Sequence, residues 1–423
     1  MIGENTLYWV WLARACGVAS KDFVRLIERF GDPFEIYSLD ESEIDYIEGI
    51  GAQLKTKLCN KSLEDSYSVI KFCKKNKVDI ISYADKRYPS RLRQLEDPPA
   101  VLFCRGKLPD LDRKLCVAVV GTRKMSEYGK HTAYKIAYEL AAANVVVVSG
   151  MALGIDGVAA SATLAADGDT VAVLGSGIDV IYPPKHRALC EEIVRSGAVI
   201  TEFMPSTPPE KCNFPIRNRI ISGLCQGTIV VEGVHRSGAL ITARAAIKQG
   251  REVFALPGKV DESNSEGPNE LIRDGANVLL SVEDVTNHYD FLYHDVINYR
   301  GLRKAKKHSQ IDHEFLEELG VCLRTYKKGE FSEEEPPEKH MALNEPLVDS
   351  SSENDNGEQK NELLAGLDEG TKKVFAQMPI DMAVSPDALV EEGFDVGDVI
   401  TSLTMLELCG LVTSLPGGLY MRK

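Results

Sequence analysis

The feature that most constrains this fold is a regular alternation of short apolar strands and helical segments between residues 112 and 290. Apolar, largely β-branched runs occur at 117–120, 145–148, 171–174, 198–201, 228–231 and 252–255. Segments with helical spacing lie between them, at 134–142, 159–166, 189–194 and 239–248. Near-continuous apolar strands joined by helices are buried on both faces. The pattern predicts an α/β fold with a Rossmann-like, doubly wound, mostly parallel sheet, in a domain that we place at residues 81–290.

The N-terminal segment, residues 1–80, has helical spacing and few β-branched runs. One amphipathic stretch opens at Ser20 and stops at Gly31-Asp32-Pro33, where glycine and proline end a helix. Gly49-Ile50-Gly51 then separates two short apolar helical stretches, which is the spacing of a SAM or helix-hairpin-helix element. The glycines either make a tight turn or present backbone amides to a phosphate. Both interpretations stay open.

Charge separates the rest of the chain into a linker and a last domain. Residues 330–362 hold eleven acidic and two basic residues, a net of −9, which leaves −5 of the chain's −14 for everything else. A segment over 291–361 that begins basic (Arg300, Arg303, Lys304, Lys306, Lys307) and ends acidic is predicted to be a flexible linker. Residues 362–423 resemble a winged helix, with helices at 371–377, 386–391 and 396–409 and a hairpin at 411–413 and 419–421.

The ten cysteines show no paired spacing with one another or with histidine. This argues against a zinc module and favours reduced thiols in the cytoplasm. The sequence opens without the basic region of a signal peptide, and no apolar run reaches the ~18 residues that span a bilayer. We therefore expect a cytoplasmic protein with no membrane span, no metal and no cofactor.

Glycine and small polar residues follow most of the predicted strands. In an open parallel sheet these positions share one edge, where ligands bind. Glycine lets backbone amides approach an anion closely, so the edge predicts a phosphate-containing ligand. A dinucleotide fingerprint and a P-loop are both missing from the sequence. Asp156 is either a general base or a helix cap. The candidate positions are Gly121, Ser149, Gly150, Gly154, Ser237 and Gly238.

Positive charge gathers at the same edge. Arg123 follows the first strand, and a loop after the strand at 198–201 carries three cations around one aromatic ring, in Lys211, Phe214, Arg217 and Arg219. Cations pair with phosphates and a ring can stack on a base, a combination suited to single-stranded nucleic acid. In the alternative interpretation Phe214 packs beneath the loop while Arg217 and Arg219 pair with Glu202 or Glu232. The residues alone leave both open.

Six motifs follow one another in a fixed order: VGTR at 120–123, SGMALGID at 149–156, GID at 177–179 with Tyr-Pro at 182–183, FPIRNRIISGL at 214–224, SGALITA at 237–243 and VFALPG at 253–258. Taken together, these motifs resemble the DprA/Smf family of DNA-processing proteins. The N-terminal and C-terminal segments match that family's architecture as well, so the resemblance covers the chain outside the linker.

The resemblance implies a non-catalytic homodimer that binds single-stranded DNA and loads the RecA recombinase onto it against single-strand binding protein, during natural transformation or more general recombination. Arg123, Lys211 and Phe214 match the family's DNA-contacting cations and aromatic ring, and Arg217 and Arg219 lie in the same matched segment. The long acidic linker departs from the family pattern. It either tethers the last domain or competes with DNA.

Two rival functions come from other classes. A nucleotide-processing hydrolase of the lysine-decarboxylase-like family shares a Rossmann-type core, but its P-G-G-x-G-T-x-x-E signature is missing at 232–238. A regulator that binds duplex DNA through the winged helix would need a basic footprint, and the last domain carries few cations among many acids.

Overall fold

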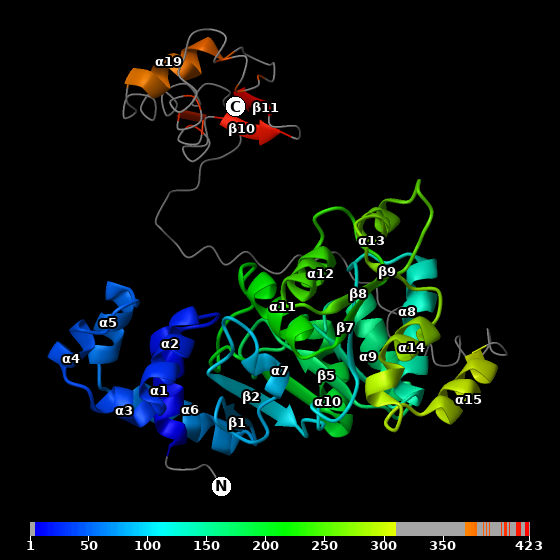
Figure 1. The fold of residues 1–423 in the computed structure, drawn as a ribbon, viewed down its shortest axis with the longest axis horizontal. Helices are drawn as coiled ribbons and strands as arrows, with labels where there is room; N and C mark the ends of the chain where they lie inside the picture. Colours follow the sequence, from blue (N-terminus) through cyan, green and yellow to red (C-terminus); the bar gives the residue numbers. More distant parts are fainter. Residues whose placement is uncertain are drawn as a thin grey trace, which may run out of the picture. The chain divides into compact units, whose positions relative to one another are not determined.

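The computed structural model describes residues 5–309, 369–378, 412–415 and 419–422, together with positions 384, 386, 389, 399, 402, 403 and 406. The chain divides into two units, residues 1–329 and 330–423. The first opens with helices α1 (Thr6–Cys16), α2 (Lys21–Phe30), α3 (Pro33–Ser38), α4 (Glu41–Asp45), α5 (Ala52–Cys59) and α6 (Glu64–Lys75). The expectation of a helical N-terminal region is thus confirmed, and Figure 1 shows these helices in blue at one end of the unit.

The sheet that follows has nine strands in the order β1-β2-β6-β5-β4-β3-β7-β8-β9. Strands β3 to β9 are parallel to one another, while β1 pairs antiparallel with β2 and β2 antiparallel with β6. The predicted α/β class and mostly parallel sheet are confirmed. The bounds are β1 (Asp79–Ser82), β2 (Val101–Gly106), β3 (Cys116–Val120), β4 (Val146–Ser149), β5 (Thr170–Val173), β6 (Ala198–Thr201), β7 (Gly227–Val230), β8 (Glu252–Ala255) and β9 (Asn277–Val278).

Helices cover both faces of this sheet because alternate strand residues point to opposite sides. On β3, Val117 and Val119 pack with α8 and α9, whereas Ala118 and Val120 pack with α11 and α12. The parallel run reverses between β3 and β7, which makes that crevice the topological switch point. The helices of this domain are α7 (Ser90–Arg93), α8 (Glu127–Ala142), α9 (Ile155–Ala165), the 3₁₀ turn η1 (Pro184–His186), α10 (Arg187–Ser196), α11 (Asn213–Gly223), α12 (Gly238–Lys248) and α13 (Ser263–Arg273).

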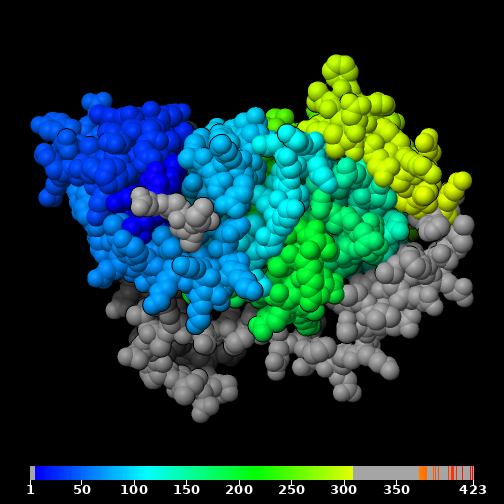
Figure 2. All heavy atoms as spheres, turned by 90° about the horizontal axis from the view of Figure 1, so that it is seen from below, coloured from blue at the N-terminus to red at the C-terminus, as the bar shows by residue number. Residues whose placement is uncertain are grey.

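Helical structure continues beyond residue 290, where we expected a flexible linker to begin. Helix α14 (Val282–Tyr293) crosses that boundary, and α15 (Tyr299–Ser309) follows it. Leu302 is buried in the same apolar cluster as α8, which explains why this basic segment is helical. Residues 310–361 of the expected linker lie outside the described part of the chain. Figure 2 shows the yellow residues of α14 and α15 at the opposite end of the unit from the blue N-terminal helices.

The second unit contains the expected first helix and terminal hairpin. Helix α19 spans Glu369–Gln377, and strands β10 (Val412–Leu415) and β11 (Leu419–Arg422) pair antiparallel, with Val412 opposite Arg422. A small apolar core joins them through Val374, Phe375 and Val412. The remaining predicted helices of this domain fall mostly outside the described residues.

Candidate nucleic-acid interface

The loops that follow β3 and β4 touch each other at the carboxyl edge of the sheet. The Ile155 N–H donates to the carbonyl oxygen of Thr122 over 3.2 Å. Gly154 has φ +80°, and a Cβ there would lie 2.3 Å from the same carbonyl oxygen. A Cβ on Gly121 would likewise meet the Ile155 side chain at 2.5 Å. These two glycines therefore allow the close approach that places the Arg123 backbone beside the start of α9.

Phe214 is the centre of a small aromatic and cationic cluster at this edge. The Arg123 guanidinium carbon lies 5.5 Å from the ring centroid of Phe214, and that of Arg217 lies 5.8 Å from it. The Tyr182 ring is a further neighbour, with centroids 5.6 Å apart and planes tilted by 42°. A Cβ on Gly175 would come within 2.9 Å of the Phe214 ring, so glycine after β5 makes room for the aromatic side chain. Tyr182 was not among the residues selected from the sequence.

The segment that carries Phe214 is a helix rather than the loop expected from the sequence. Helix α11 starts at Asn213, and Pro215 stands in its first turn, where a helix has no need of that N–H. Lys211 and Arg123 are exposed, and Phe214 is half-buried. The positive end of the α11 dipole thus lies beside Lys211, which adds to the attraction for an anion.

Arg217 points inward from α11 and ties the ends of two strands together. Its guanidinium donates to the carbonyl oxygens of Gly150, at 2.9 Å, and of Val173. The side chain is buried, which lowers the pKa of Arg217 to about 10, while nearby Asp156 acts in the opposite direction. Burial raises the pKa of Asp156, and Arg217 partly offsets this rise. Arg217 thus supports Phe214 from below instead of facing solvent.

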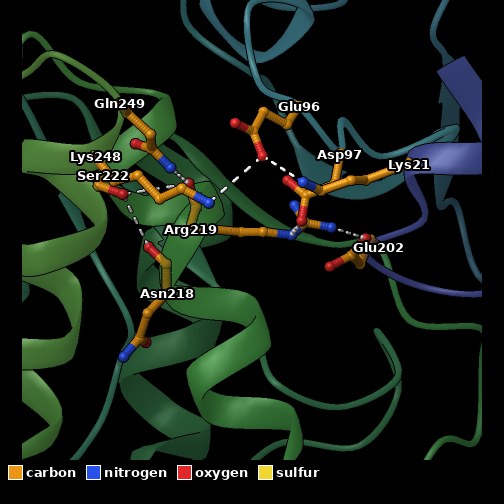
Figure 3. Close-up of polar contacts among 9 residues, drawn as sticks. All are labelled: Lys21, Glu96, Asp97, Glu202, Asn218, Arg219, Ser222, Lys248 and Gln249. Atoms are coloured by element: carbon orange, nitrogen blue, oxygen red, sulfur yellow. Dashed lines mark hydrogen bonds and ion pairs between the residues drawn. The ribbon is translucent and has the colours of Figure 1, made fainter.

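Arg219 is also buried, in an ion pair with acidic residues. Its Nη2 donates to Glu202 Oε2 over 2.7 Å, and its Nε lies 3.3 Å from Asp97 Oδ2. Figure 3 shows the Arg219 side chain between these two carboxylates. Of the alternative interpretation, only the pairing of Arg219 with Glu202 is found, because Arg217 donates to backbone carbonyl oxygens instead of to Glu202 or Glu232. Arg217 contacts the ends of β4 and β5, whereas Arg219 contacts Glu202 and Asp97 on a different side of α11. Both side chains are buried, so these two arginines do not join Arg123 and Lys211 at the surface.

Among the remaining positions chosen from the sequence, some form hydrogen bonds inside the domain and others lie at its surface. The Ser149 hydroxyl is buried and donates to the Val119 carbonyl oxygen, and the Gly150 N–H donates to Asp156. Ser237 precedes α12 as its N-cap residue, and its buried Oγ has no hydrogen-bond partner among the described residues. Gly238 is exposed, with no atom within 4 Å of the place that a Cβ would occupy.

The loop that carries Arg123 is held from below by Glu232, which the alternative interpretation had considered as a partner for Arg217 or Arg219. The Ser126 N–H donates to Glu232 Oε2 over 2.9 Å, and the Ser126 hydroxyl donates to Oε1. The Thr122 N–H donates to the Glu232 carbonyl oxygen over 2.8 Å. Glu232 is only 2% exposed. It therefore fixes the β3–α8 loop across the switch point.

Within the described ranges, no group of three or more histidine, cysteine or acidic side chains could hold a metal ion. No helix among the described residues has the length and apolar character that crossing a membrane requires.

Comparison with known proteins gives the same family for both units. Residues 79–290 match the family model described as DNA recombination-mediator protein A, and residues 358–418 match the DprA winged helix domain. The chain is 36% identical to Protein Smf of Escherichia coli (strain K12), over 79% of this chain and 75% of that protein. It is 38% identical to the DNA processing protein DprA of Bacillus subtilis (strain 168), over 55% of this chain and 80% of that protein.

A solved structure agrees with this assignment. The X-ray structure of DNA processing protein A from Streptococcus pneumoniae superposes with a TM-score of 0.59 and 35% identity, and the match covers 67% of this chain and 97% of that one. The expected resemblance and the winged-helix assignment are therefore confirmed. The chain belongs to the DprA/Smf family of DNA recombination-mediator proteins.

Proposed function

We propose that this protein binds single-stranded DNA at the carboxyl edge of its sheet and loads a RecA-type recombinase onto it, without making or breaking a covalent bond. The observation that carries the proposal is the half-buried Phe214 ring with exposed Arg123 and Lys211 on the same edge. Family membership supports it, because the family model is described as a DNA recombination mediator.

Each surface residue has a distinct chemical part in this proposal. Arg123 and Lys211 pair with successive phosphates, and the amino-terminal end of α11 adds its dipole. Phe214 offers a face to one base, an interaction worth about 1–3 kcal/mol. Arg217 and Glu232 act as positioning residues, since both are buried and hold the segments that carry Phe214 and Arg123. Stacking on an aromatic ring needs an unpaired base, which favours the single strand over the duplex.

The family resemblance also implies protein partners for this chain. We propose a cytoplasmic homodimer that presents two such pockets and acts on strands covered by single-strand binding protein. Its action would be measured as a shorter lag before RecA hydrolyses ATP on covered single strands.

Fluorescence anisotropy with labelled single-stranded and duplex oligonucleotides tests the DNA-binding step. We expect preference for the single strand and an affinity that falls with salt. Arg123→Ala and Lys211→Ala should each weaken binding and reduce the salt slope by about 0.7, the value for one phosphate contact on a single strand. Lys86→Ala removes an exposed cation elsewhere in the sheet domain and serves as the matched control.

Unchanged binding in the Arg123→Ala, Lys211→Ala double variant would refute this site. Equal affinity for single strand and duplex would refute the stacking chemistry. Release of free base from nucleoside monophosphates by the wild-type protein would favour the hydrolase alternative instead.

A further inference from the structure

Helix α15 is a concentration of positive charge in an acidic protein. Its sequence, YRGLRKAKKHS, contains five lysines and arginines and no acidic residue, whereas the chain as a whole carries −14. The DNA site proposed above uses none of these cations. Acidic neighbours or an anionic ligand would each stabilise a helix of this composition.

Packing fixes this helix firmly to the sheet domain. Leu302 and Ala305 are buried, at 2% and 5% exposure, and Leu302 belongs to the core under α8. A Cβ on Gly301 would lie 2.1 Å from the Ala142 carbonyl oxygen at the end of α8. Just before the helix, the Asn298 N–H donates to the Ala143 carbonyl oxygen over 2.8 Å. The side of α15 opposite these contacts is therefore held in a constant orientation.

Only one of the five cations of α15 forms an ion pair with an acidic side chain among the described residues. Lys306 pairs with Glu283 in the first turn of α14. Arg300, Arg303, Lys304 and Lys307 are exposed, and none of them has an ion pair with another described residue. Their spacing of three and four residues makes them neighbours on one side of the helix, and like charges so placed repel each other. This repulsion destabilises the helix unless an anion lies against it.

We propose that these four residues, which we call the α15 stripe, bind phosphates of a single strand that also reaches the Phe214 pocket. The inference rests on the proposed function and extends it with a second contact surface. Arg300 and Lys307, the outer residues of the stripe, are seven residues apart and so lie about 10 Å apart along the helix axis. That is a row long enough for more than one phosphate. Helix α15 begins beside the end of α8, near the start of β4, and Lys306 reaches Glu283, just after β9 ends. The helix therefore runs from the amino side of the sheet toward the carboxyl edge.

The stripe has a chemical signature that differs from that of the pocket. Its four residues are all cations, so it should recognise the backbone and not the bases. Its contribution should require a strand longer than one pocket can hold. The contribution of the stripe to DNA affinity should also fall more steeply with salt than the contribution of base stacking, because each phosphate contact releases counterions.

The test replaces all four stripe residues by glutamine, in a variant Arg300→Gln, Arg303→Gln, Lys304→Gln and Lys307→Gln. Glutamine retains helix propensity, so α15 should stay folded. The matched control makes the same change in net charge at four scattered exposed cations, namely Lys71→Gln, Lys86→Gln, Lys107→Gln and Arg195→Gln. Both variants are measured by anisotropy with a short oligothymidylate that fills one pocket and with a long one, across a salt series.

We expect the stripe variant to bind the short strand like wild type and the long strand more weakly. Its salt slope on the long strand should fall by up to about 3, at about 0.7 per lost phosphate contact. The control variant should match wild type on both strands. Equal slopes in the stripe variant and wild type, or equal losses in the stripe and control variants, would overturn the proposal.

Two further outcomes separate this inference from the function on which it rests. A gain in affinity on neutralising the stripe would mean that it binds an acidic segment of the protein itself, which overturns the inference while leaving the pocket intact. Failure of the wild type to bind the short strand, with stripe-dependent binding of the long one, would refute the pocket and support the stripe.

Discussion

Replacing Arg219 by methionine tests whether this arginine supports the fold or contacts a ligand. Its partner Glu202 has a side chain only 2% exposed, so the substitution leaves a buried carboxylate without its counter-charge. Breaking a buried ion pair in this way costs about 3–5 kcal/mol. We expect a loss of that size in the free energy of unfolding. Glu96, which pairs with exposed Lys21 and Lys248 in the same region (Figure 3), should contribute far less, because water and salt screen exposed ion pairs.

The loss should depend on pH in a defined direction. Burial raises the pKa of Glu202, and Arg219 opposes this rise. Without Arg219 the folded-state pKa of Glu202 moves further above its unfolded value. A carboxyl group whose pKa is higher in the folded than in the unfolded state favours folding most at a pH below its unfolded pKa. This contribution to the free energy of unfolding is lost as the pH rises through the folded pKa. Arg219→Met should therefore cost less stability near pH 5 than near pH 8.

Urea unfolding at both pH values measures the effect. The double variant Arg219→Met, Glu202→Gln should recover much of the loss, because the unpaired charge is gone. A loss below about 1 kcal/mol, or one that is equal at the two pH values, would refute the reasoning. Weakened DNA binding with unchanged stability would show that Arg219 contacts the ligand directly, as the sequence had suggested.

Three further predictions concern the pocket and its support. If a base also stacks on Tyr182, which lies beside Phe214, Tyr182→Ala should weaken binding of an intact single strand by about 1–3 kcal/mol and leave binding of an abasic strand unchanged. The control Tyr182→Phe should bind both strands like wild type. Equal losses on the two strands would contradict stacking. Gly129→Ala should destabilise the protein by about 1–3 kcal/mol in urea unfolding, because the new Cβ would lie 2.2 Å from Glu232 Cδ, and Glu232→Ala should relieve part of that cost. Cys212 is the exposed cysteine among those described, and burial raises the pKa of Cys104 to about 12, so a thiol reagent at pH 8 should modify Cys212 first. Saturating single strand should slow that reaction, and an unchanged rate would argue against DNA beside Lys211.

The antiparallel edge and helix α11 show where the sequence was insufficient. Strands β1 and β2 were not predicted, since these antiparallel strands lie outside the repeated strand–helix alternation that marks the parallel strands. The segment that forms helix α11 was expected to be a loop after the strand at 198–201. In the structure Pro215 stands in the first turn of that helix, where proline is tolerated.

The sequence by itself determined the alternation of strands and helices, the crowding of glycines after the strands, and the presence of cations with one aromatic ring on a single edge. Each of these is a local property of spacing and residue type. Only the tertiary structure decided which cations face solvent. Arg123 and Arg219 have the same side chain, but the helical turn of α11 directs Arg219 toward Glu202, while the β3–α8 loop leaves Arg123 over Phe214. Burial and pairing depend on segments distant in the chain, so composition and spacing could not distinguish the two arginines.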